Sequence, residues 1–349
     1  MILILFYILV FCLCYFGYKS NENNLLVNVS LFSLLFLFSG FALNFGPDWK
    51  NYESLYLSSP EIIYDRSFEP LFILLSHIYS SYGLSYVFVQ ASYAFLSLLF
   101  IFLTIKKFPY MYTSIFIYVS ITDLYIQNMI GFRQSLAVSI TFYASVIYFL
   151  ENRKIYSFLI ISTAAFLIHY SALICIGAFF IFPILKKQYS SYLYITSYFI
   201  SLIIGYFGVI HLFYSLLDGR YNYYSTVGGG GILRMLFPSS LAFLIIYISK
   251  YRIYDRLFIF MMNYLFFGIL IFNIFLSNIY MLRFWNYFEI ATIYFIPYLI
   301  YKQKNVANRY TLFFIFAAYF FTSYSFIVYK YISEYDYNNL LIKLIWGLI

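Results

Sequence analysis

Long apolar stretches, separated by short gaps that carry most of the charge, constrain this chain more than any other feature. Hydrophobic residues make up 64% of its 349 positions and charged residues only 10%. A helix of about 20 apolar residues spans the hydrocarbon core of a bilayer, whereas a soluble core of this size needs far more surface charge. The sequence therefore predicts an all-α polytopic integral membrane protein.

The apolar stretches predict about 12 transmembrane helices, within a range of about 11 to 14, some of them short or re-entrant. We expect a single transmembrane domain over residues 1–349, with its longest polar segments in outer loops at 46–67 and 216–233. The predicted spans are 2–18, 25–45, 84–105, 109–126, 131–150, 155–168, 170–185, 190–214, 235–249, 257–277, 281–300 and 310–329.

The basic residues indicate which gaps face the cytoplasm. Cytoplasmic loops of membrane proteins are enriched in Lys and Arg, and the net charge of +8 follows from this bias. The N-terminus, the loops 46–67 and 216–233 and the C-terminal tail then face outward. No clustered basic surface indicates nucleic-acid binding. The gaps taken as cytoplasmic contain Lys19, Lys106, Lys107, Arg153, Lys154, Lys186, Lys187, Lys250, Arg252, Arg256, Lys302, Lys304 and Arg309.

Two segments do not fit a simple span. Residues 68–82 are apolar but short, and Pro70 suits the first turn of a helix. A full crossing there would place Lys106 outside, so we expect a re-entrant or interfacial helix. Residues 155–185 are too long for one span and short for two, and the polar break at His169 predicts two short helices with this histidine near the outer surface.

Polar residues of the first outer loop have the spacing of a helix face. Asp48, Tyr52 and Tyr56 lie four residues apart and share one face. A carboxylate accepts hydrogen bonds from sugar hydroxyls, and an aromatic ring stacks on the apolar face of a sugar. The loop is therefore a candidate sugar-binding segment, with an ordinary solvated loop as the alternative.

Several arginines lie on the predicted outer side, where orientation bias does not explain them. Arg133 follows Gly131 in the first turn of a span, and Arg220, Arg234 and Arg283 lie in or beside outer loops. A guanidinium group binds phosphate oxygens in pairs and stays charged, which suits a lipid pyrophosphate. Local salt bridges and contacts with lipid headgroups are the alternatives.

His169 is the candidate acid or base, because imidazole titrates near neutral pH. A hydrogen-bonded structural histidine is the alternative. The chain contains no glycine-rich phosphate loop and no zinc signature, and its three cysteines lie inside apolar stretches. These absences disfavour ATP-driven transport and metal-dependent transfer from nucleotide sugars. We predict no metal site and no cofactor.

Four short motifs follow one another along the chain, and together they resemble the EpsG family, a branch of the Wzy-like polysaccharide polymerases. They lie in the first outer loop, before the short apolar helix, at the start of a span, and about 35 residues after that. The motifs are Gly46-Pro47-Asp48-Trp49-Lys50-Asn51-Tyr52, Glu69-Pro70, Arg133-Gln134-Ser135-Leu136-Ala137 and His169-Tyr170-Ser171-Ala172-Leu173.

The resemblance implies a metal-independent membrane glycosyltransferase at the outer face of the bacterial cytoplasmic membrane. Such enzymes polymerise undecaprenyl-pyrophosphate-linked repeat units into capsule, O-antigen or exopolysaccharide. The implied partners are these lipid-linked oligosaccharides, membrane lipids and a chain-length regulator. A lipid-linked oligosaccharide flippase or transporter is one alternative, although a transporter often shows repeated halves. A related O-antigen ligase or acyltransferase is another, and the sequence does not separate a ligase from a polymerase.

Within this resemblance, each polar candidate receives an expected role. Arg133 and Arg220 are expected to bind the pyrophosphate, and Arg283 is a third candidate. Arg234 is a further expected substrate-binding residue. His169 or Asp48 is expected to activate the acceptor hydroxyl. Two further residues complete the expected site: Glu69, which would hold an arginine or a sugar, and Tyr52, which would contact the substrate.

Overall fold

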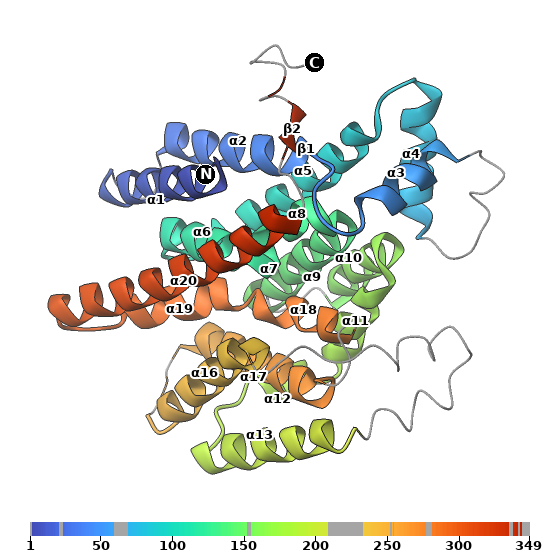
Figure 1. The fold of residues 1–349 in the computed structure, drawn as a ribbon. Coiled ribbons are helices and arrows are strands. Elements are labelled where there is room, and N and C mark those ends of the chain that lie inside the picture. Colours follow the sequence, from blue (N-terminus) through green and yellow to red (C-terminus); the bar gives the residue numbers. More distant parts are fainter. Residues whose placement is uncertain are drawn as a thin grey trace. The chain divides into compact units, whose positions relative to one another are not determined.

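The fold is almost entirely helical. The computed structural model describes residues 2–20, 24–58, 69–208 without 152–154, 233–276 without 252 and 254, 281–334, 338–340 and 343. Helices dominate this part, which confirms the all-α prediction (Figure 1). The chain forms two compact units, one of residues 1–173 with 296–349 and the other of residues 174–295. The expected single domain stays a prediction.

The first unit contains most of the polar candidates. Two helices lie at the boundaries of the units, α11 (Leu173–Phe179) and α19 (Thr292–Tyr301). The elements of the first unit are α1 (Ile2–Lys19), α2 (Leu25–Gly40), β1 (Ala42–Leu43), α3 (Trp49–Leu57), α4 (Pro70–Ser81), α5 (Tyr86–Ile105), α6 (Met111–Ser120), α7 (Thr122–Tyr125), α8 (Gln127–Ile130), α9 (Phe132–Glu151), α10 (Ile155–Ile168), η2 (Tyr170–Ala172), α20 (Val306–Glu334) and β2 (Asn338–Asn339).

The second unit is built around a buried helix, α17. Asn263 of α17 donates hydrogen bonds to the carbonyl oxygens of Leu185 and Lys187, at 2.8 and 2.7 Å. These carbonyls lie at the end of α12, where a helix leaves backbone acceptors without partners of its own. The elements of this unit are α12 (Phe182–Leu185), α13 (Ser191–Tyr206), α16 (Leu233–Ile248), α17 (Arg256–Ile274), η3 (Met281–Phe284) and α18 (Asn286–Glu289).

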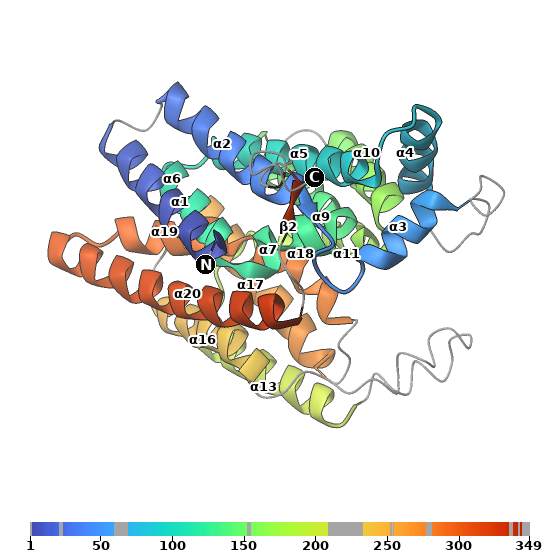
Figure 2. The same cartoon turned by 45° about the horizontal axis from the view of Figure 1, so that its top comes forward.

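In the first unit, α5 and α9 form the centre. α5 packs against α9 and α2, and α10 packs against the other side of α9, as Figures 1 and 2 show. Leu98 of α5 and Ala137 of α9 are fully buried, and Ser97 of α5 hydrogen bonds to Ser139 of α9 at 2.8 Å. Small residues and hydroxyl groups let helices approach closely in a membrane, where apolar packing alone provides no preference for helix over lipid.

Three helices of the described residues are long and apolar enough to cross a membrane, namely α1, α5 and α17. Two of the other predicted spans are interrupted. The span expected at 109–126 is broken at Ile121, whose backbone is extended between α6 and α7. The span expected at 170–185 is broken before α12, where Pro183 lies in the first turn, a position that suits a proline because it has no backbone N–H to donate. The number of spans stays a prediction.

The short helix expected at 68–82 is present as α4. It begins at Pro70 and has 12 residues, so it is about 18 Å long and shorter than the hydrocarbon core of about 30 Å. The proline also keeps the preceding residue, Glu69, in an extended conformation. Of the predicted outer loops, residues 59–67 and 216–232 lie outside the described part of the chain.

Gly46, at the start of the first outer loop, packs closely against Ile130 at the end of α8. Its φ of +89° is in the left-handed region, and a Cβ there would lie 1.9 Å from Cγ2 of Ile130. We expect Gly46→Ala to reduce the free energy of unfolding by about 2–5 kcal/mol, the sum of left-handed strain and overpacking.

The matched control is Gly83→Ala, because Gly83 also has a positive φ, +67°, but no atom within 4 Å of a built Cβ. This variant should lose only the strain contribution of about 1–2 kcal/mol. Unfolding of the purified proteins in micelles measures both. Equal losses would show that close packing on Ile130 contributes nothing.

Candidate functional site

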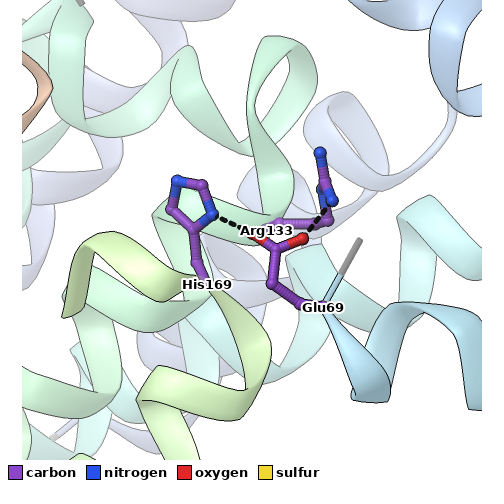
Figure 3. A network of polar contacts seen from close by, with 3 residues as sticks. All are labelled: Glu69, Arg133 and His169. Carbon is purple, nitrogen blue, oxygen red and sulfur yellow. Dashed lines mark hydrogen bonds and ion pairs between the residues drawn. The ribbon is translucent and has the colours of Figure 1, made fainter. Parts of the chain in front are cut away.

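Three elements of the first unit bring an acid, a base and an arginine together. Glu69 is the residue before α4, Arg133 is the second residue of α9, and His169 is the residue after α10. α4 contacts α10, and α10 packs along α9. Figure 3 shows the carboxylate of Glu69 between the other two side chains. The helix breaks at His169 as the sequence predicts, which places the imidazole at a helix end.

Each carboxylate oxygen of Glu69 has its own partner. Nη1 of Arg133 donates to Oε2, and Nδ1 of His169 lies 2.5 Å from Oε1. All three side chains are largely enclosed, with 6% of Glu69, 12% of Arg133 and 16% of His169 exposed. The side chains of Arg133 and His169 are therefore more accessible than that of Glu69, which lies between them.

The helix ends explain the placement of these charges. A carboxylate is favourable at the N-terminus of α4, because the macrodipole is positive there. Arg133 is at the N-terminus of α9, where a cation is unfavourable without a counter-ion. Glu69 supplies that counter-ion.

The environment of Glu69 keeps its carboxyl group ionised. Burial by itself raises the pKa of the Glu69 carboxyl, but the hydrogen bond from His169 and the charge of Arg133 outweigh it, so this pKa is lowered. Glu69 is therefore ionised at neutral pH and can only accept hydrogen bonds.

The ionised carboxylate determines the tautomer of His169. Because Oε1 of Glu69 can only accept, Nδ1 of His169 carries the proton that lies between them. In the neutral imidazole, Nε2 is then the basic nitrogen. A carboxylate that holds one nitrogen of a histidine and leaves the other as the base is an arrangement suited to general-base catalysis.

Aromatic rings hold the guanidinium group of Arg133. Its central carbon lies 4.7 Å from the ring centre of Tyr52 and 4.9 Å from that of Phe72. The ring of Tyr52 in turn packs against Phe132, at 4.7 Å between centroids. Contact of a cation with ring faces is attractive, and more so where water is excluded. Arg133 therefore has few orientations available.

The predicted helix with Asp48, Tyr52 and Tyr56 on one face is α3. Both tyrosines are buried, and the hydroxyl of Tyr56 donates to the carbonyl of Leu84. The face thus packs into the protein around Arg133. Its expected contact with a sugar stays a prediction. Asp48 is the half-buried residue before α3, one turn from Tyr52.

The remaining arginine candidates are not part of the described cluster. Arg220 lies outside the described residues, and of Arg234 only the backbone, in α16, is described. Arg283 is an exposed residue of η3 in the second unit. Their expected contact with a pyrophosphate stays a prediction.

The residues that support the cluster are not apparent from the sequence. Phe72 and Phe132 are ordinary apolar residues in their segments, and nothing in their spacing indicates contact with an arginine or with Tyr52. Asn128 gives a usable signal, because the sequence places an amide beside an apolar segment, and the structure buries that amide fully. Polar residues in such positions are functional candidates in membrane proteins.

A comparison with known families finds a match over nearly the whole chain. The model of the EpsG family matches residues 25–340. No curated protein and no solved structure matches the chain.

Proposed function

Because the chain belongs to the EpsG family of Wzy-like polysaccharide polymerases, we propose that it polymerises lipid-linked oligosaccharide repeat units. It is a multi-pass membrane protein. The proposed donor is a glycan on undecaprenyl pyrophosphate, and the proposed product is capsule, O-antigen or exopolysaccharide at the outer face of the cytoplasmic membrane. The observation that carries this proposal is the Glu69 carboxylate shared between Arg133 and His169.

The proposed reaction transfers a glycan from one lipid carrier to another. The acceptor sugar hydroxyl attacks the anomeric carbon of the donor glycan, and the bond from that carbon to the pyrophosphate oxygen breaks. Nε2 of His169 takes the proton of the acceptor hydroxyl, while Glu69 holds Nδ1 and stabilises the imidazolium that forms. Asp48, at the start of α3, is the second candidate for this base.

The leaving pyrophosphate gains negative charge as the bond breaks, and arginines would stabilise that charge. Arg133 is the candidate with a described environment, because its guanidinium contacts Glu69, Tyr52 and Phe72 and its side chain is still 12% exposed. Arg220, Arg234 and Arg283 are the further candidates. The donor is already activated, so the proposed reaction requires no metal and no nucleotide.

Arg133→Lys is expected to reduce chain elongation by about tenfold or more, although the charge is retained. Lysine lacks the planar fork that contacts a carboxylate and a phosphate together, and it stacks less well between rings. The matched control is Arg309→Lys, since Arg309 also lies over a ring, that of Tyr301, at 5.5 Å. Elongation is measured in membranes that contain equal amounts of each variant. Full activity of Arg133→Lys would remove Arg133 from the site.

A deletion strain distinguishes the proposed polymerase from the alternatives. We expect the glycan ladder to disappear and a single repeat unit to remain on its lipid carrier. Precursor that accumulates on the cytoplasmic side would instead indicate a flippase. A full ladder that stays unattached would indicate a ligase.

A further inference from the structure

A buried amide crosses the break between two helices just before Arg133. Asn128 lies in α8 and is fully buried. Its Nδ2 donates to the hydroxyl of Tyr118 at 2.8 Å and to the carbonyl of Tyr125 at 2.9 Å, while its Oδ1 accepts from the hydroxyl of Ser135 at 2.8 Å. One side chain thus connects α6 and α7 to the first turns of α9.

The connection continues into α5. The hydroxyl of Ser97 lies 3.2 Å from that of Ser135 and 2.8 Å from that of Ser139, and Ser139 donates to the carbonyl of Ser135 at 2.9 Å. These serines are all buried. In an apolar surrounding a buried polar group without a partner is unfavourable, so a network of this kind favours one arrangement of its helices.

The backbone conformation at the break sets the direction of α9 relative to α8. Gly131 separates α8 from α9 with φ −131° and ψ 51°, outside the helical region. Arg133 follows two residues later, and Ser135 two residues after that. A change of angle at Gly131 is amplified along the arginine side chain, so the guanidinium would leave its contacts with Glu69 and Tyr52.

We propose that Asn128 is a positioning residue, which fixes the start of α9 so that Arg133 meets Glu69 and Glu69 meets His169. Any effect of Asn128 on catalysis rests on the function proposed above, whereas its effect on the position of Arg133 does not. Ser135 is the partner through which Asn128 acts on α9. Neither residue contacts the reacting groups in this proposal.

The test compares Asn128→Ala with Thr141→Val in the full-length protein. Thr141 is also a buried polar residue of α9, but among the described residues its hydroxyl bonds to carbonyls of its own helix, those of Ala137 and Val138. The probe of position is phenylglyoxal, which modifies accessible arginines and is followed at Arg133 by mass spectrometry. The probe of function is chain elongation in membranes with the endogenous lipid-linked repeat units. Before these measurements, both variants are checked to be folded and monodisperse.

We expect Asn128→Ala to speed modification of Arg133 several-fold and to lower the maximal elongation rate by about ten- to a hundredfold with little change in apparent KM. Thr141→Val should change neither. Ser135→Ala should resemble Asn128→Ala, and Ser135→Thr, which keeps the hydroxyl, should restore most of the rate. Combined with Arg133→Lys, Asn128→Ala should add little further loss, because both act at the same guanidinium.

Unchanged modification of Arg133 in Asn128→Ala would overturn the positioning proposal, and so would equally faster modification in Thr141→Val. Faster modification with full elongation activity would support the positioning of Arg133 and overturn the proposed role of the cluster in polymerisation. The two proposals can therefore fail separately.

Discussion

Replacing His169 with asparagine is expected to lower the rate of chain elongation by about 10²–10⁴-fold, the range that a general base contributes. The asparagine amide nitrogen can take the place of Nδ1 and keep a hydrogen bond to Oε1 of Glu69. The variant therefore retains the contact and loses the basic Nε2. The loss should appear in the maximal rate, and the amount of protein in the membrane should stay near that of the wild type.

The control is His77→Asn, because His77 is an exposed residue of α4 that is not a member of the cluster. This variant should elongate glycan at the wild-type rate. If His169→Asn were nearly as active as the wild type, the base would have to be sought elsewhere. Asp48→Asn would then be the decisive variant, since Asp48 is the remaining candidate for acceptor activation.

Glu69→Gln is expected to abolish activity and to lower the free energy of unfolding by about 3–5 kcal/mol. Removal of one partner of a buried ion pair leaves the other charge without compensation. The resulting loss of stability is larger than the net stabilisation that the intact pair provides. Here the largely enclosed Arg133, whose side chain is 12% exposed, would lose the Glu69 carboxylate at the positive end of α9. Glu53→Gln, in the neighbouring helix α3 and half-buried, is the control and should change stability little.

The stability difference between wild type and Glu69→Gln should depend on pH. Because the pKa of Glu69 is lowered in the folded protein, its contribution is fully present above the ordinary glutamate pKa of 4.5 and is lost as the pH falls through the lowered value. Unfolding in micelles from pH 7 down to about 3 measures this. A difference that is constant over this range would show that the carboxylate charge does not stabilise the fold.

The candidate site could be predicted from the sequence only as separate pieces. The break at His169 and the helix that begins at Pro70 follow from local rules, because a first turn favours proline and a polar break interrupts an apolar helix. The spacing of Tyr52 and Tyr56 correctly indicates one helix face. Spacing does not say what covers that face, and the structure places Phe132 and Arg133 against Tyr52.

By itself, the sequence determined the helical class and the membrane setting of the protein, since both depend on apolar content and on interactions within one helix. Only the tertiary structure decided that Glu69 meets Arg133 and His169, which are 64 and 100 residues away along the chain. The reason is physical: helix periodicity relates residues within a few turns, whereas contacts between helices depend on which surfaces pack together. The amide of Asn128 belongs to the same category, because its partners come from α6, α7 and α9.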